Sequence, residues 1–295
     1  MVADSSSVLI PGPWEHRRLS ANGQQFHVAL AGRDGDPLIV LLHDFPEFWW
    51  AWRHQIPALA AAGYRVAAPD MRGYGASDKT PRDLATPLFC FDTAGLISAL
   101  GYRDAIVVGH GLGGQVAWAM AAFTPEVVRA LVAVASPSPR VVKRRPLPPR
   151  ALAWLTSLFT PYFAERAITH GTGVPEVFNQ WAALPLAEST QASAEVVRTY
   201  QEAMRLPFAA RCAIEHFRWQ MGVHNEGRWY RKHLKDAELV PTRILYGQRD
   251  TFFPPRFFSD DLRAVPIAHA GHFLPEEAPE AVTAEILAFA RGLVN

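Results

Sequence analysis

Strand-like and helix-like segments alternate along most of this chain, and this alternation restricts its fold more than any other feature. Apolar runs typical of strands buried on both faces of a sheet recur at residues 37–42, 65–69, 105–108 and 129–136. Helix-like segments lie between them, at residues 50–62, 91–100 and 115–123. The alternation predicts an α/β fold with a mostly parallel, doubly wound sheet and helices on both of its faces.

A hairpin is expected before this region, because strand-like residues 14–19 and 25–31 are joined through Asn22-Gly23. The alternation stops near residue 137, where a linker contains Pro137, Pro139, Pro146, Pro148 and Pro149. Aromatic-rich helical stretches follow, until residues 243–246 resume a strand and residues 278–293 form a final amphipathic helix. We therefore expect a core domain of residues 1–137 and 238–295, with a helical cap domain inserted at residues 138–237.

The composition is that of an ordinary globular protein. The chain has 295 residues, of which 49% are hydrophobic and 19% charged, and its formal net charge is +1. So balanced a charge gives no reason to expect binding to nucleic acid or to an anionic membrane. The two cysteines, Cys90 and Cys212, suggest neither a disulfide framework nor a metal site. Without a signal-peptide pattern or a long apolar run, we expect a cytoplasmic protein. We expect no cofactor, and the sequence does not indicate an oligomeric state.

Three motifs resemble the epoxide hydrolases of the α/β-hydrolase superfamily, with haloalkane dehalogenases as near relatives. They are His-Asp-Phe-Pro-Glu-Phe-Trp-Trp-Ala-Trp-Arg at residues 43–53, Pro-Asp-Met-Arg-Gly-Tyr-Gly-Ala-Ser-Asp at residues 69–78, and Gly271-His272-Phe273 with Glu277-Ala-Pro-Glu280 behind it. The resemblance covers nearly the whole chain and is weakest in the cap. Its motifs are specific for the fold and less specific for the reaction, because dehalogenases and esterases share most of them.

The expected position of the attacking residue is occupied by glycine. Residues 105–108 lead into Gly109-His110-Gly111-Leu112-Gly113-Gly114, the Gly-x-nucleophile-x-Gly frame of a sharp strand-to-helix turn. The resemblance implies Asp at position 111 in an epoxide hydrolase and Ser in an esterase. Gly111 has no atom that can attack carbon, and it suits a backbone with positive φ. We therefore expect no covalent intermediate. The sequence does not tell whether Gly111 is natural or engineered.

The resemblance implies catalytic roles for two other residues. It assigns His272 as the histidine that activates the attacking water, and Asp250, in Tyr-Gly-Gln-Arg-Asp, as the acid that orients this histidine. Asp250 also suits a capping role before Pro254-Pro255, and both roles are compatible.

The anion-binding side of the site departs from the family pattern. The resemblance implies an oxyanion hole made by the backbone N–H groups of Phe45 and Leu112. The family usually has His-Gly-Phe-Pro where this chain has Asp44 in the second position. Asp44 is either a negative charge that opposes oxyanion stabilisation or a solvated loop carboxylate. In a third interpretation Asp44 acts as a relocated base, but its position in the motif does not match the turn.

The cap is the third departure. Epoxide hydrolases use two cap tyrosines to hydrogen-bond the epoxide oxygen, and the best match to the second is Phe217. Trp154 and Tyr162 lie near the first in different registers, and either is equally compatible with simple packing. The residues expected to line a ligand pocket are Asp44, Trp49, Trp154, Tyr162 and Phe217, with Phe45 and Leu112 beside them.

Three hypotheses follow for the function. The first is an epoxide-hydrolase-like protein that lacks covalent chemistry but keeps a capped apolar pocket for a small hydrophobic molecule, with the His272–Asp250 pair retained. The second is an active hydrolase or lyase in which His272, oriented by Asp250, activates water or abstracts a proton without a covalent intermediate. The third is a protein–protein module, for which only scattered aromatic residues argue.

Overall fold

An eight-stranded sheet runs through the molecule in the order β1-β2-β4-β3-β5-β6-β7-β8. The computed structural model describes residues 5–80, 84–144, 148–149, 160–183, 191–220 and 239–293. Strands β1 and β2 form an antiparallel hairpin, β2 pairs antiparallel with β4, and the remaining neighbours are parallel. The strands are β1 Glu15–Ala21, β2 Gln24–Ala31, β3 Leu38–Leu42, β4 Arg65–Pro69, β5 Ala105–His110, β6 Val128–Val134, β7 Thr242–Gly247 and β8 Ala264–Ile267.

The centre of the sheet is formed by strands that are buried along their whole length. Every residue of β3, β4 and β5 is buried, because helices cover both faces of this part of the sheet. The continuous apolar runs in the sequence reflect this burial, and the predicted mostly parallel α/β sheet is confirmed. The short edge strand β8 was assigned no residues in the sequence analysis. Two of its four residues are half-buried and Pro266 is exposed, so it lacks the apolar run that identifies the inner strands.

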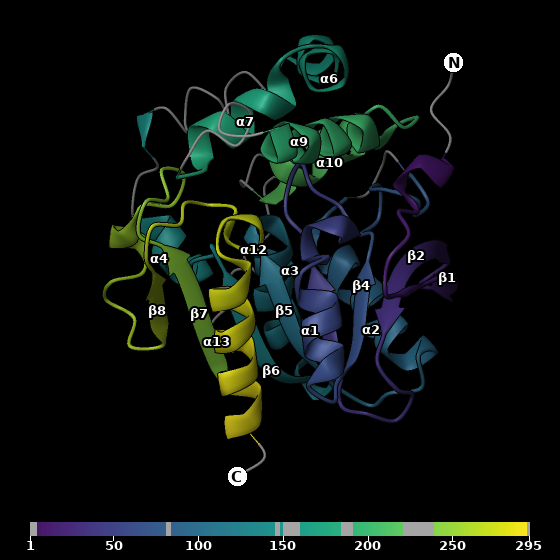
Figure 1. The fold of residues 1–295 in the computed structure, drawn as a ribbon, viewed down its shortest axis with the longest axis vertical. Helices are drawn as coiled ribbons and strands as arrows, with labels where there is room; N and C mark the ends of the chain where they lie inside the picture. Colours follow the sequence, from purple (N-terminus) through teal and green to yellow (C-terminus); the bar gives the residue numbers. More distant parts are fainter. Residues whose placement is uncertain are drawn as a thin grey trace.

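Helices pack on both faces of the sheet (Figure 1). On one face α1 (Gln55–Ala61) packs against α13 (Pro279–Gly292), and α2 (Thr86–Ala99) packs against α3 (Gly111–Phe123) elsewhere on the sheet. The sequence prediction started the third of these helical segments at residue 115, but α3 begins at Gly111. A run of glycines does not favour a helix, so only the tertiary fold places its first turn there.

Further helices lie between β6 and β7 in the chain. Figure 1 shows most of them above the end of the sheet where the parallel strands terminate, with α4 beside β7 and β8, and we call them the covering helices. They are α4 Pro139–Arg144, α6 Pro161–His170, α7 Gly173–Trp181, α9 Gln191–Met204 and α10 Ala209–Gln220. The exact limits of a cap domain at residues 138–237 remain a prediction. Of the helices in the described ranges, none has the length and apolar character needed to cross a membrane.

A buried polar cluster ties the covering helices to the core. Glu276, in the short helix α12 (Leu274–Glu277), accepts a 2.6 Å hydrogen bond from Nη2 of Arg53. The hydroxyl of Tyr200 in α9 donates to the same carboxylate. Because Glu276 belongs to the segment that follows His272, this cluster holds α9 over the part of the core that carries the histidine.

Candidate active site

The turn between β5 and α3 has the compact geometry that its glycines predict. Gly111 has φ of +48°, as expected from the sequence. A Cβ atom on Gly109 would lie 2.3 Å from the carbonyl oxygen of Gly113, and a Cβ on Gly113 would lie 2.4 Å from that of Leu42. Neither position has room for a side chain, because helix, strand and the neighbouring strand β3 meet here. The sharp turn is therefore built by close backbone approach.

Asp44 reaches directly into this turn. Strands β3 and β5 are parallel neighbours with Leu42 paired to Gly109, and Asp44 and Gly111 each lie two residues after this pair. The Leu112 N–H donates a 2.7 Å hydrogen bond to Oδ1 of Asp44. A Cβ on Gly111 would lie only 2.0 Å from Cγ of Asp44, so the Asp44 carboxyl group occupies the space of a side chain at position 111.

This placement corrects two interpretations made from the sequence. Asp44 is 2% exposed, so it is not a solvated loop carboxylate. Its carboxylate also does match the turn, although its position in the motif gave no sign of this. The error has a physical source: strand pairing, which brings residues 44 and 111 together, is not visible in either motif alone. The N–H of Leu112, expected to bind a substrate oxyanion, is already bound to Asp44.

His272 lies between two carboxylates. Its Nδ1 is 2.8 Å from Oδ2 of Asp250, and its Nε2 is 3.1 Å from Oδ2 of Asp44. Burial lowers the pKa of His272, but the charges and hydrogen bonds of both carboxylates raise it to about 10. Burial also opposes ionisation of Asp44, yet the hydrogen bond from His272 and nearby charges hold the pKa of Asp44 below its usual range. Both contacts therefore favour an imidazolium that donates to two carboxylates.

Asp250 contacts His272, as its expected orienting role requires, but it caps no helix: the 3-10 helix Pro255–Phe257 begins after Pro254 and has no side-chain cap. Asp250 follows β7, and its Oδ2 contacts His272 while its Oδ1 accepts the N–H groups of Phe252 and Phe253 at 2.8 and 2.9 Å. These backbone bonds fix the carboxylate in place. An acid held in this way orients the imidazole ring and stabilises its charged form.

Glu277 shapes the loop that carries the histidine. It accepts backbone N–H groups from Gly271 and Phe273, on either side of His272, both at 2.9 Å. It also accepts the N–H of Ala183, at the end of α7, at 2.7 Å. Burial raises the pKa of Glu277, while these three donors lower it. One side chain thus joins the histidine loop to a covering helix.

Two further histidines, His43 and His110, contact the backbone carbonyl groups of Asp44 and His272. His43 accepts the N–H of Met71 at Nε2, so its Nδ1 carries the proton and donates to the Asp44 carbonyl at 2.9 Å. Burial lowers the pKa of His43, in keeping with a neutral ring. His110 lies between Oε2 of Glu47, at 2.9 Å from Nδ1, and the His272 carbonyl, at 2.8 Å from Nε2. The sequence analysis did not single out His110 or Glu47, whose contacts are visible only in the fold.

Three residues of the site, Asp44, His110 and His272, are candidate ligands for a metal ion. Ligand atoms of Asp44, His110 and His272 lie within 4.8 Å of one another. Each imidazole nitrogen of His110 and His272, however, already faces a carboxylate or carbonyl oxygen. A metal needs a free nitrogen lone pair, and these nitrogens are instead arranged to share protons with oxygens. The arrangement thus fits acid–base chemistry better than metal binding.

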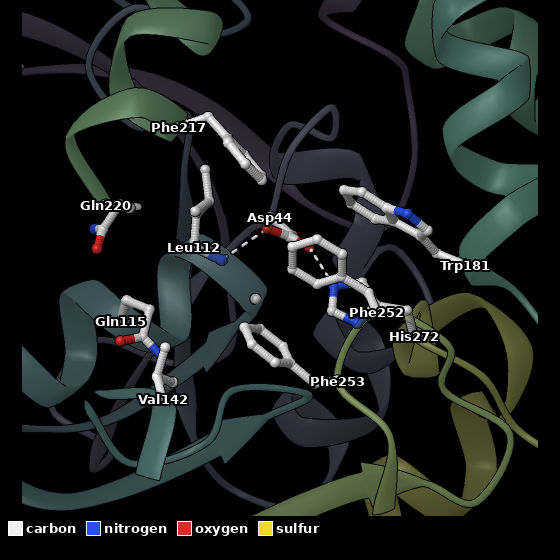
Figure 2. A pocket seen from close by; sticks show the side chains of 11 residues that line it. Asp44, Leu112, Gln115, Val142, Trp181, Phe217, Gln220, Phe252, Phe253 and His272 are labelled. Atoms are coloured by element: carbon white, nitrogen blue, oxygen red, sulfur yellow. Dashed lines mark hydrogen bonds and ion pairs between the residues drawn. The ribbon is translucent and has the colours of Figure 1, made fainter. Parts of the chain in front are cut away.

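A small pocket opens over Asp44 and His272 (Figure 2). Its volume is about 30 Å³. Aromatic side chains surround the two ionised groups, and Phe217 lies close above Asp44. The described residues that line it are Asp44, Gly111, Leu112, Gln115, Val142, Trp181, Phe217, Gln220, Phe252, Phe253 and His272. It therefore suits a small, mainly apolar group next to Asp44.

The residues expected to line the pocket are distributed differently. Phe217 lines it, and Phe45 packs behind Phe217 with ring centroids 5.3 Å apart. Trp49 is buried elsewhere: its indole N–H donates to the Val8 carbonyl at 2.9 Å, so the structure does not place it in this lining. Trp154 and the side chain of Tyr162 lie outside the described residues.

Several lining residues had no signal in the sequence. Trp181 comes from α7, and Gln115 and Gln220 come from α3 and α10, which are far apart in the chain. Only Phe252 and Phe253 could have been found, because they directly follow Asp250 in the sequence. The covering helices cannot be assigned to the site before their packing is known.

Comparison with known proteins agrees with this geometry. The family model described as the alpha/beta hydrolase fold matches residues 37–279. The AB hydrolase superfamily protein YfhM of Bacillus subtilis is 35% identical over 298 residues, covering 92% of this chain and 96% of that protein. Epoxide hydrolase 4 of Mus musculus is 29% identical over 287 residues, covering 92% of this chain and 78% of that protein.

A solved structure is similar over nearly its whole length. Epoxide hydrolase A from Mycobacterium thermoresistibile superposes with a TM-score of 0.69 at 25% identity, covering 95% of this chain and 98% of that one. The chain therefore belongs to the α/β-hydrolase family, and within it is similar to epoxide hydrolases.

Proposed function

We propose that this protein binds a small, mainly apolar molecule in the pocket over Asp44 and His272 and hydrolyses it, without any attack from position 111. The observation that carries the proposal is the buried chain of hydrogen bonds from Asp250 through His272 to Asp44 at the base of that pocket. Such a chain places proton donors and acceptors where water is largely excluded, and this strengthens their electrostatic effect.

The lining restricts the substrate class. The described lining residues include no lysine or arginine, and the negative charges of Asp44 and the adjoining Asp250 outnumber the single positive charge of His272. An anionic group would therefore be repelled at the base of the pocket, whereas an uncharged epoxide or ester would be tolerated. Gln115 and Gln220 are the neutral amides in the lining. Because Phe217 carries no hydroxyl, the assistance that a cap tyrosine gives in epoxide hydrolases must come from another group.

A second candidate is ligand binding without turnover. The specific observation in its favour is that the polar groups of the site already satisfy one another: the N–H of Leu112 and both ring nitrogens of His272 are bound to carboxylates. This matches the hypothesis of a hydrolase-fold protein that lacks covalent chemistry. That hypothesis, however, assumed that no side chain occupies the turn, and Asp44 does so.

One paired experiment separates the two candidates. The full-length protein is screened with uncharged aryl and alkyl epoxides and with short-chain esters, following both product release and the shift in melting temperature. Hydrolysis requires product formation that disappears in Asp250→Ala. A melting shift without product from any compound supports the binding candidate. Carboxylate analogues of the same compounds serve as controls and are expected to bind less well.

A further inference from the structure

We propose that Asp44 is the attacking residue of this protein. The resemblance implies glycine at position 44 and aspartate at position 111, and in this chain the two residues have exchanged places. Epoxide hydrolases carry glycine in the loop position of Asp44 and aspartate in the turn position of Gly111. This inference rests on the proposed function and extends it to one reaction class, the opening of a small epoxide at a saturated carbon.

The geometry of the turn carries the proposal. A Cβ atom on Gly111 would lie 2.0 Å from Cγ of Asp44, and 2.1 and 2.2 Å from its two oxygens. The carboxyl group of an aspartate at position 111 would begin one C–C bond beyond that Cβ. Asp44 therefore brings the same functional group to nearly the same place from the neighbouring strand. The exchange also explains why position 111 holds glycine, since any larger residue would collide with Asp44.

The two oxygens of Asp44 have different surroundings. Oδ1 accepts the Leu112 N–H, whereas Oδ2 lies next to Nε2 of His272, and the side chain lines the pocket. Figure 2 shows both interactions, with the ring of Phe217 above the carboxylate. One oxygen is thus held by the backbone and the other is available at the pocket base. This is the division that a carboxylate nucleophile needs, because the held oxygen later carries the developing negative charge.

The first step forms an ester. Oδ2 of Asp44 forms a bond to an epoxide carbon while the C–O bond of the ring breaks, and the resulting alkoxide takes the proton from Nε2 of His272. The imidazolium supplies this proton because the described lining residues present no tyrosine hydroxyl. Esterification also removes the charge of Asp44, one of the causes of the raised pKa of His272, so the proton leaves more readily at this stage.

The second step releases the product and restores the site. Neutral His272 removes a proton from water, and the hydroxide attacks Cγ of Asp44. The negative charge collects on Oδ1, which faces the Leu112 N–H. The bond between Cγ and the ester oxygen then breaks, and the departing alkoxide takes the proton from His272. The carboxylic acid left on Asp44 then gives its proton to His272, which restores the imidazolium and the carboxylate. The sum is epoxide plus water to diol, and Asp44 retains one oxygen atom from that water.

The decisive experiment is a single turnover in H₂¹⁸O with the full-length protein in excess over propylene oxide. After digestion, mass spectrometry of the peptide that contains Asp44 should show ¹⁸O, while the diol of the first turnover should contain none. The peptide that contains Asp250 is the internal control and should stay unlabelled. In His272→Gln, diol formation should be lost, because this variant lacks both the proton donor for ring opening and the base that activates water.

Variants supply a second test. Asp44→Asn keeps the shape and the Leu112 hydrogen bond, and we expect it to lower the rate at least about 100-fold. Gly111→Asp alone should also be impaired, because two carboxylates compete for one space. The double variant Asp44→Gly with Gly111→Asp restores the family arrangement and should exceed either single change at these positions by at least about tenfold. Melting curves establish that each variant is folded.

The outcomes separate this inference from the proposed function. Diol with no label in the Asp44 peptide, an adduct on another residue, or a rate for Asp44→Asn close to that of the wild type would overturn the role of Asp44 while leaving hydrolysis intact. An adduct on Asp44 without diol release would keep this inference and contradict the proposed hydrolysis. Neither adduct nor diol with any epoxide would contradict both.

Discussion

Replacing Gly111 with alanine should destabilise the fold through two separable effects. The backbone at this position has φ of +48°, a left-handed region that costs an L residue about 1–2 kcal/mol. The added methyl would also lie 2.0 Å from Cγ of Asp44, so the carboxylate must move and lose the hydrogen bond from Leu112. A hydrogen bond to a charged group contributes about 1.5–3 kcal/mol. The expected loss is therefore about 2.5–5 kcal/mol.

The assay is urea unfolding followed by tryptophan fluorescence, after reversibility has been established. Gly101→Ala is the matched control for backbone strain, because Gly101 has φ of +84° and no atom within 4 Å of an added Cβ. Its loss should be confined to about 1–2 kcal/mol. In the Asp44→Gly background, Gly111→Ala should cost a similar amount, because the collision is gone. The cycle then yields an interaction energy of about 1.5–3 kcal/mol.

An equal cost of Gly111→Ala in both backgrounds would refute the reasoning. It would mean that the Asp44 carboxylate does not occupy the turn in solution, and the argument for a relocated nucleophile would lose its geometric basis. A cost for Gly111→Ala that matches Gly101→Ala in the wild-type background would lead to the same conclusion.

Three further predictions concern the surroundings of His272 and the pocket. Glu277→Ala removes the acceptor of three backbone N–H groups and should lower the free energy of unfolding by about 2–3 kcal/mol in urea, whereas Glu280→Ala, at an exposed position, should leave it unchanged. The folded-state pKa of His272 is raised from 6.5 to about 10, so its contribution to stability is complete below pH 6.5 and is lost as pH rises through about 10. The urea midpoint of the wild type should therefore fall across that window more steeply than that of His272→Gln, and parallel curves would show that the histidine is not protonated. Phe217→Tyr adds a hydroxyl to the pocket wall and should raise the rate of epoxide opening by about tenfold or more, measured as diol formation, with an unchanged rate excluding Phe217 from the position of the second tyrosine.

Side chains next to the site form hydrogen bonds to backbone atoms of the site residues. Glu277 holds the N–H groups on both sides of His272, and His43 holds the carbonyl of Asp44. Contacts of this kind constrain the path of the main chain, so they position a reacting group without touching it. Their loss is therefore expected to change stability and rate together, which distinguishes them from the removal of Asp44 or His272 side chains.

The sequence alone determined the architecture, because that information is local. Continuous apolar runs report burial on both faces, so strands such as residues 65–69 could be located directly. The turn at Gly111 and its positive φ followed from the spacing of glycines, and the motif around His272 placed the histidine after the last strand. Where local signals are weak the prediction failed, as for β8 and for the first turn of α3.

Only the tertiary structure decided what occupies the active site. The pairing of Leu42 with Gly109 brings two loops together that are more than sixty residues apart, and this pairing puts the Asp44 carboxylate into the space left by Gly111. Considered separately, Gly111 is a missing nucleophile and Asp44 is an unfavourable charge, and each departs from the family pattern. Because a side chain is defined by where it ends in space and not by where its Cα lies in the chain, the two departures are one arrangement in the folded protein.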